Sequence, residues 1–299
     1  MRKYIKGLQG FAVCALALCS LNTIAIADNH SSRLDQMASP IIDPVNFEDP
    51  RIQSEARLIY LNHELDDDFA TGGGNIQIVA LQLRYALNDR WALVANKDGY
   101  VWVDPDNEIP GVVEEEDGIG NIGGGVKYAF YMDSDAIMSA HLRYEFPVGD
   151  DEVLQGEGDG VLQPAVSAAY GLCGNSTLMW SAGFRLPIDD EDSTFFDADL
   201  HWDYRIDTGA GAFYPNLEAN IIHVVDGGER LGIADEGQDY FNLGASEADG
   251  KTIVVGGVGA RYRFTHDLDV GASYQVPLTS GSGSNIIDWR VITDLIYRF

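Results

Sequence analysis

Apolar and polar side chains alternate with a period of two at the end of the chain, over residues 291–299. Val291, Leu295 and Phe299 fall in one phase, and Asp294 and Arg298 fall in the other. A period of two places the two sets on opposite faces of a β-strand. One face suits lipid and the other carries charge, as in a strand of a membrane barrel.

The same alternation recurs along most of the chain. The segments that show it cover residues 54–65, 76–87, 90–103, 119–131, 136–147, 161–172, 177–187, 195–206, 211–225, 251–264, 268–278 and 286–299. Very short connections, such as 88–89 and 265–267, alternate with longer ones, such as 104–118 and 226–250. Short turns at one end and long loops at the other are typical of bacterial outer-membrane barrels. The pattern predicts an all-β fold, a transmembrane antiparallel up-and-down β-barrel of about 12 strands with both termini on the periplasmic side.

Aromatic side chains gather beside the short connections. They are Tyr85, Trp91, Tyr128, Tyr170, Tyr204, Phe213, Tyr262, Phe264, Tyr297 and Phe299. A soluble β-sandwich would also alternate, with its charged face toward solvent. A row of aromatic rings at one level is instead what an interfacial girdle produces, and we therefore favour the barrel.

The beginning of the chain has the composition of a secretory signal peptide. A basic start precedes a short apolar run over 11–21, and Ala25-Ile26-Ala27 predicts cleavage after Ala27. Lipidation at Cys19 is the weaker alternative, because bulky Leu18 stands where a small residue belongs. The predicted organisation is a signal peptide over 1–27, an extended N-terminal segment over 28–53 and a barrel over 54–299. The extended segment is expected either to be disordered in the periplasm or to fold into the barrel mouth.

The mature chain would be strongly acidic. The signal peptide carries three of the 19 basic residues, which leaves 16 basic against 47 acidic side chains and a net formal charge of −31. This acidity argues against nucleic acid or an anionic membrane surface as a partner. Acid concentrates in the loops at 66–68, 114–117, 150–152 and 189–192. These runs are interpreted as solubilising surface, with binding of divalent cations as the alternative. Cys173 alone remains after cleavage, so no intramolecular disulfide is possible.

The charged phase of the predicted strands supplies the candidate lumen residues. They are Arg84, Lys127, His141, Arg143, Glu145, Arg185, Asp199, His201, Asp203, Arg205, Glu218, Arg261, Arg263, Asp288, Arg290 and Asp294. Barrels of this size either leave a narrow channel or are filled by their own side chains. Salt bridges and a solute path are equally consistent with this residue set.

Three sequence patterns resemble functional motifs, but each lacks a feature that the function requires. Residues 118–123 match G-x-G-x-x-G but enter a strand, whereas the dinucleotide fingerprint opens a helix. The row from Asp197 to Asp203 cannot bind a metal alone, because alternate residues of one strand lie about 6.5–7 Å apart. Ser139 and His141 share a face but are two residues apart, so no catalytic nucleophile is expected. The sequence predicts neither an enzyme nor a cofactor, and it does not decide whether a metal site is present.

Short motifs resemble a known family. Residues 118–128, Gly-Ile-Gly-Asn-Ile-Gly-Gly-Gly-Val-Lys-Tyr, resemble a strand of the meta-pathway phenol-degradation family of outer-membrane β-barrel proteins. Further similarity lies at Pro164, 215–220, 259–264 and 274–278. The resemblance implies transport of small solutes, hydrophobic or aromatic compounds among them. The strand ending in Phe299 also resembles the closing strand of outer-membrane barrels, which serves as their assembly signal.

The expected function is therefore an outer-membrane channel or transporter for a small solute. A charged lumen suits an aromatic solute poorly. A closed barrel with a structural or surface-binding role is one alternative, and an outer-membrane lipid hydrolase is a weaker one. The expected partners are outer-membrane lipid and lipopolysaccharide, the barrel-assembly machinery through Phe299, and the solute, with divalent cations at the acidic loops as a further candidate.

Overall fold

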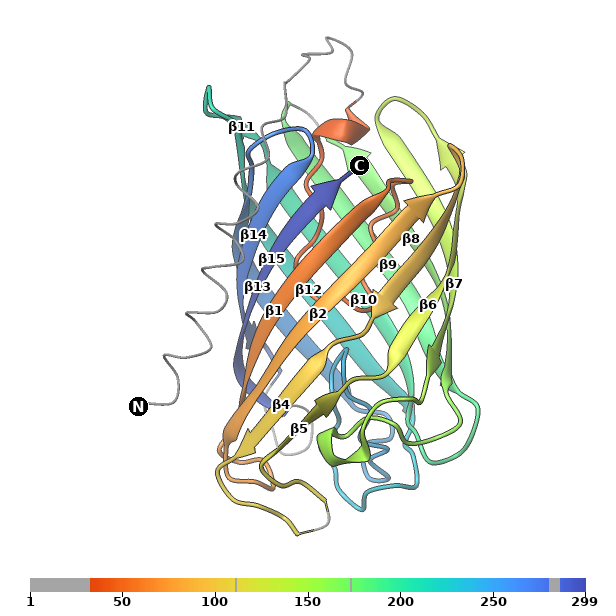
Figure 1. Cartoon of the computed structure of the whole chain (residues 1–299), viewed down its shortest axis with the longest axis vertical. Coiled ribbons are helices and arrows are strands. Elements are labelled where there is room, and N and C mark those ends of the chain that lie inside the picture. Colours follow the sequence, from red (N-terminus) through yellow and green to blue (C-terminus); the bar gives the residue numbers. More distant parts are fainter. Residues whose placement is uncertain (1–32, 111, 173, 280–285) are drawn as a thin grey trace. The chain divides into compact units, whose positions relative to one another are not determined.

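A computed structural model of the chain describes residues 33–110, 112–172, 174–279 and 286–299 (Figure 1). Its strands are β1 (Glu55–Leu65), β2 (Gly74–Ala86), β3 (Trp91–Lys97), β4 (Tyr100–Pro105), β5 (Glu116–Ile119), β6 (Ile122–Met132), β7 (Ala136–Phe146), β8 (Val161–Gly171), β9 (Ser176–Pro187), β10 (Thr194–Tyr204), β11 (Ile206–Asp207), β12 (Ala212–Asp226), β13 (Thr252–Arg263), β14 (Leu268–Pro277) and β15 (Ile287–Arg298). Two short 3-10 helices are η1 (Leu34–Gln36) and η2 (Asp151–Val153). The expected signal peptide and Cys173 lie outside the described residues.

The strands close into an antiparallel barrel. β1 pairs with β15 on one side and with β2 on the other, so the described sheet has no free edge at this seam. β3 and β4 are two parts of one wall strand, as are β5 and β6, and the short β11 follows β10. The barrel therefore has 12 strands, which confirms the predicted fold class.

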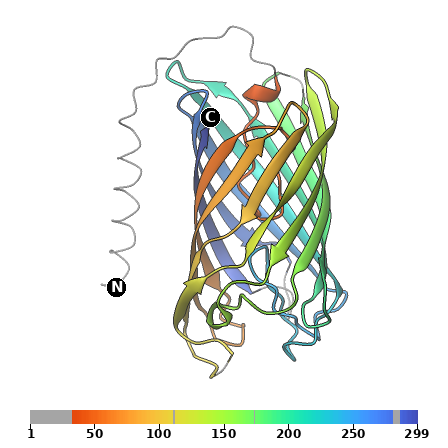
Figure 2. The ribbon, with the colours of Figure 1, turned by 45° about the vertical axis from the view of Figure 1, so that its right-hand side comes forward.

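The two ends of the barrel differ, as Figures 1 and 2 show. At one end, called the turn end, the connections are short, such as residues 133–135 between β6 and β7. The chain also ends there, at Phe299. At the other end, called the loop end, the connections are long, and residues 227–251 between β12 and β13 form one of them. The predicted alternation of short and long connections is confirmed.

One wall strand is interrupted between β3 and β4, at Asp98 and Gly99. Gly99 has φ +136°, and a Cβ there would lie 3.0 Å from the carbonyl oxygen of Val79, so only glycine fits without strain. The Asp98 carboxylate accepts a hydrogen bond from the backbone N–H of Leu81 at 2.9 Å. The Asp98 side chain thus replaces a backbone hydrogen bond between strands that is lost at the interruption.

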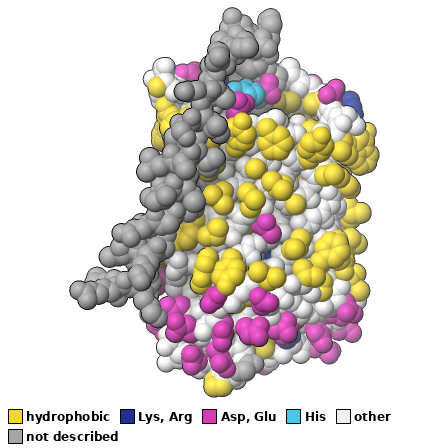
Figure 3. Space-filling model, viewed as in Figure 1, with side chains coloured by type: hydrophobic (Ala, Val, Ile, Leu, Met, Phe, Trp, Pro, Cys, Tyr) yellow, Lys and Arg dark blue, Asp and Glu magenta, His cyan; other side chains and the backbone are white. Residues whose placement is uncertain are grey.

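The outer wall is largely apolar, and acidic side chains gather at the loop end (Figure 3). Exposed apolar side chains of the wall include Leu83, Leu142, Leu200, Leu217 and Val258. Near the turn end, Trp91 packs on Tyr128 with ring centroids 4.5 Å apart, and Tyr262 packs on Phe264 at 4.7 Å. Among the described residues, no helix has the length and apolar character needed to cross a membrane.

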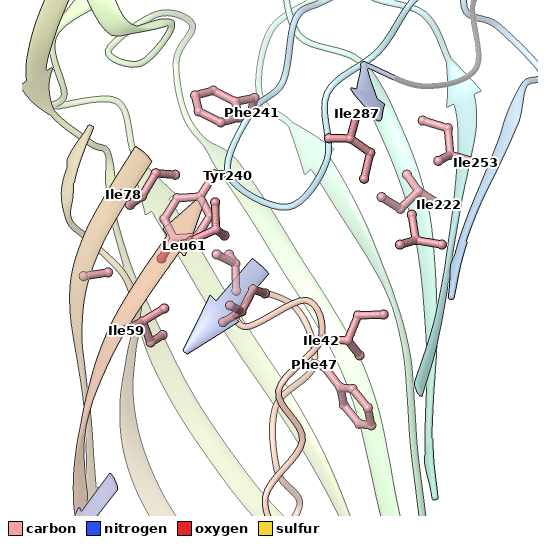
Figure 4. Close-up of a cluster of buried hydrophobic side chains, with 14 of the residues drawn as sticks. Ile42, Phe47, Ile59, Leu61, Ile78, Ile222, Tyr240, Phe241, Ile253 and Ile287 are labelled. Carbon is pink, nitrogen blue, oxygen red and sulfur yellow. The ribbon is translucent and has the colours of Figure 1, made fainter. Parts of the chain in front are cut away.

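Two segments outside the wall fold into the barrel, and we call them the inner segment (residues 34–53) and the inward loop (residues 227–251). Figure 4 shows where their apolar side chains meet the wall. Ile42 and Phe47 come from the inner segment, Tyr240 and Phe241 from the inward loop, and Ile59, Leu61, Ile78, Ile222, Ile253 and Ile287 from the wall. The apolar core of the protein therefore lies inside the barrel.

The placement of Asp288 differs from the prediction. β15 carries one extra residue here, because Glu64 of β1 pairs with Trp289 and the next residue, Leu65, pairs with Ile287. Such a bulge changes the alternation of side chains locally. Ile287 is buried and Asp288 is exposed. The prediction that Asp288 lines the lumen was wrong, since strict alternation across the bulge does not hold.

Candidate functional site

Among the described residues, ten basic side chains of the wall lie on the inside of the barrel. They are Arg57, Arg84, Lys97, Lys127, Arg143, Arg185, Arg261, Arg263, Arg290 and Arg298. A buried cation is costly unless it has a counter-charge or acceptors. The acceptors are supplied partly by acidic residues of the wall and partly by the two segments that fold inward.

Most of the predicted lumen residues lie where the sequence placed them. Buried inside are Arg84, Lys127, His141, Arg143, Glu145, Arg185, Asp199, His201, Asp203, Glu218, Arg261, Arg290 and Asp294. Arg263 is half-buried near the turn end, where Nη2 donates to the carbonyl oxygen of Met37 at 2.9 Å. Arg205 is the second exception after Asp288. It follows the end of β10, is partly exposed and pairs with Asp207 at 2.7 Å, because β10 ends at Tyr204, two residues before the end of the predicted segment.

Wall arginines hold the backbone of the inner segment. Arg261 Nε donates to the carbonyl oxygen of Ser39 at 3.0 Å, and Arg57 Nη2 donates to that of Pro40 at 2.9 Å. Arg143 Nη1 donates to the carbonyl oxygen of Val45 at 2.6 Å. An extended segment has carbonyls without strand partners, and guanidinium groups satisfy them here.

The carboxylate of Glu48 joins the inner segment to two wall strands. Arg84 of β2 donates to it at 2.9 and 2.7 Å, and Lys127 of β6 donates to it at 2.7 Å. Lys127 also donates to the carbonyl oxygen of Asp49 at 2.7 Å. All four residues are buried. The alternation along β2 and β6 predicted the two wall cations, whereas Glu48 lies in a segment without periodicity.

A second set of acidic residues binds the start of the inner segment. The carboxylate of Glu218 accepts hydrogen bonds from the backbone N–H groups of Ile41 and Ile42, at 2.7 and 3.1 Å. It also lies 2.8 Å from His201 Nδ1, whose Nε2 lies 3.0 Å from Asp203. His201 and Asp203 belong to the row of side chains on β10 that suggested metal ligands, and both are engaged in these hydrogen bonds. In the described part of the chain, no group of three or more His, Cys, Asp or Glu side chains has the geometry of a metal site.

The inward loop is held in the same way from the loop end. Arg185 Nη1 donates to the carbonyl oxygen of Gln238 at 2.8 Å, and Lys97 Nζ donates to that of Tyr240 at 2.8 Å. Arg290 donates to the side chain of Gln238 at 3.0 Å and pairs with Asp239. The tip of the loop therefore reaches cations on three parts of the wall.

A set of polar contacts fixes the base of the inward loop. Arg230 pairs with Glu157 at 2.7 Å and with Asp192 of the neighbouring loop. Ser193 donates to Glu236 at 2.7 Å. Burial raises the pKa of Asp192 to about 7, even though Arg230 acts in the opposite direction.

The serine and histidine considered for catalysis do not bond to each other. Ser139 Oγ donates to the carbonyl oxygen of Pro50 at 2.5 Å, and His141 Nε2 lies 2.8 Å from Ser167 Oγ. A nucleophilic serine needs a base within hydrogen-bond reach. For Ser139, the arrangement instead supports a role in holding the end of the inner segment.

No family model and no curated protein matches the chain. Among solved structures, it is similar to an outer membrane channel from Pseudomonas putida F1, with a TM-score of 0.55 and 18% identity over 86% of this chain and 100% of that chain. It is also similar to the NanC porin, with a TM-score of 0.51 and 9% identity over 82% of this chain and 100% of that one. At these identities the similarity shows a shared barrel fold.

Proposed function

We propose that the protein is a passive channel of the bacterial outer membrane for small solutes, closed in this conformation by the inner segment and the inward loop. The observation that carries the proposal is how the inner segment is held. Wall arginines and Lys127 donate to its carbonyl and carboxylate oxygens. Water or a solute that offers the same acceptors can take over these hydrogen bonds when the inner segment moves, so the wall cations need not be left unpaired.

The location in the outer membrane is part of the proposal. The apolar outer wall, the aromatic pairs near the turn end and the barrel fold support it. Cleavage after Ala27, assembly through Phe299, and binding of lipopolysaccharide or divalent cations at the acidic loops remain predictions.

The charged wall around the inner segment favours water-soluble solutes. The resemblance to the meta-pathway family implies hydrophobic or aromatic ones, and the apolar cluster around Tyr240 and Phe241 is the part of the interior that would suit them. Membership of that family remains a prediction, because no family model matches.

The test is single-channel conductance of the refolded full chain in planar bilayers. Glu48→Ala removes the carboxylate that joins the inner segment to Arg84 and Lys127, so we expect it to conduct more often or with larger steps than the wild type. Glu247→Ala removes an exposed carboxylate of the inward loop and serves as the matched control. If neither the wild type nor Glu48→Ala conducts, the channel proposal fails.

A closed structural barrel is the second candidate, and the filled interior favours it. Buried side chains of the inner segment and the inward loop occupy the space that a permanently open pore would leave to water. The same recordings separate the two functions, because a structural barrel stays silent even after the inner segment is loosened.

A further inference from the structure

Strand β13 carries glycine at two successive inward positions, Gly257 and Gly259. In the register of the wall, Gly259 lies between Asn216 of β12 and Ser273 of β14, and Gly257 lies between Glu218 of β12 and Gln275 of β14. The inner face of β13 is therefore bare backbone at this level, with polar side chains on both sides.

These polar side chains lie close to the space above the two glycines. A Cβ on Gly259 would lie 2.7 Å from Asn216 Oδ1. A Cβ on Gly257 would lie 3.2 Å from Ser273 Oγ and 3.3 Å from Gln275 Cγ. We call Asn216, Ser273 and Gln275 the cradle, because they surround a floor that has no side chain of its own.

Every polar side-chain atom of the cradle is buried without a hydrogen-bond partner among the described residues. These atoms are Asn216 Oδ1 and Nδ2, Ser273 Oγ, and Gln275 Oε1 and Nε2. The three residues are 2%, 3% and 0% exposed. Buried polar groups are rarely left unpaired in native proteins, and three neighbouring ones indicate a site made to pair with something else.

The chemistry of the cradle is neutral. Each amide offers both donors and an acceptor, and the serine hydroxyl offers both as well. The charged groups next to it are already engaged, since Arg261 binds Asp294 at 2.7 and 2.8 Å, and Glu218 binds the inner segment. A matching ligand therefore has adjacent donors and acceptors and no net charge, as the hydroxyl groups of a sugar or polyol do.

The inner segment passes over the residues next to the cradle. Glu218 is the next inward residue after Asn216 on β12 and binds Ile41 and Ile42. Arg261 is the next one after Gly259 on β13 and binds the Ser39 carbonyl oxygen. Movement of residues 39–42 would therefore uncover the cradle.

We propose that the cradle is a subsite for a neutral, hydroxyl-rich solute, which hydrogen-bonds to Asn216, Ser273 and Gln275 over the glycine floor of β13. This inference rests on the proposed channel function, because the solute reaches the cradle through the interior. The inner segment and the solute then compete for the same part of the wall.

The test measures block of the ion current by maltotriose, a neutral trisaccharide, in the full chain carrying Glu48→Ala. We expect concentration-dependent block. Adding Asn216→Ala and Gln275→Ala together raises the Kd of block by about tenfold, because several hydrogen bonds are lost. Gly257→Ala keeps all three polar side chains but fills the floor, and it weakens block in the same direction. Gln163→Ala serves as the matched control, since it removes a buried amide of β8 that already bonds to Glu145.

The outcomes separate this inference from the channel proposal. Ion current without block by the sugar, or equal block in the Asn216→Ala/Gln275→Ala variant, overturns the cradle and leaves the channel standing. Absence of any ion current overturns both. Unchanged ion conductance in the cradle variants shows that they fold, so a weaker block then reports binding.

Discussion

The carboxylate of Glu48 lies 2.7 Å from Nη2 of Arg84, so a wall strand is ion-paired to a segment inside the barrel. Both side chains are almost fully buried, at 1% and 3% exposure. Lys127 shares the same carboxylate from the other side, at 2.7 Å. This buried triad links the inner segment to β2 and β6, and removing Glu48 takes the shared counter-charge away from both cations.

We expect Glu48→Gln to lower the free energy of unfolding by about 3–5 kcal/mol, because Arg84 and Lys127 would stay buried with less opposing charge. Arg84→Met in the same chain should restore part of that loss, since one unpaired cation is removed with it. A double-mutant cycle measured by urea unfolding in lipid vesicles gives the coupling energy. Additive effects of the two substitutions would contradict the link.

The inward loop should respond to pH through Asp192. Its pKa is about 7 in the closed loop, whereas a solvated aspartate titrates near 4. Between these two pH values, Asp192 is protonated when the inward loop is closed and ionised when the loop is open. Acidification therefore stabilises the closed loop, and the closed loop becomes less stable as the pH rises through 7. We expect the open probability to rise between pH 5 and pH 8. Asp192→Asn should flatten this rise, and Asp267→Asn, in an exposed turn at the other end, should not.

Phe241 anchors the inward loop in the apolar cluster and is 1% exposed. Phe241→Ala removes a buried ring, a change that typically costs about 3–5 kcal/mol. Since the loop can open without unfolding the wall, we expect the loss to appear locally, as faster tryptic cleavage after Arg230. Leu278→Ala, which shortens an exposed side chain, is the control. Equal cleavage rates in both variants would show that Phe241 does not hold the loop.

A substitution of Phe299 separates assembly of the barrel in the membrane from its ion conductance. Its ring is 67% exposed and stacks on Tyr297, while its backbone N–H bonds to Ser54 across the barrel seam. We expect Phe299→Ala to reduce the amount of folded protein in the outer membrane of expressing cells, with unchanged conductance after refolding in vitro. Phe264→Ala removes another exposed ring and should leave the amount unchanged. A similar reduction in both variants would indicate a general role of aromatic rings instead of a terminal signal.

Much of the barrel could be predicted because the responsible signal is local. On β10, Asp199 and His201 alternate with Leu200 and Trp202, and the period of two assigns each side chain to a face without knowledge of its neighbours. Most of the buried wall cations followed from the same rule, although Arg57 and Lys97 were not among the predicted residues. The rule failed at Asp288 and Arg205, where a bulge and a strand end interrupt the alternation.

Alternation within each strand was enough to predict the strand pattern, the apolar outer face and the charged inner face. The partners of those inner charges, in contrast, depend on how the closed barrel brings distant segments together. Glu48 and the carbonyl groups of Ser39, Pro40 and Val45 carry no periodic signal, because their partners come from distant strands brought together by barrel closure. The cradle likewise exists only once β12, β13 and β14 align in register. Strand formation depends on neighbours in sequence, but the filling of the interior depends on neighbours in space.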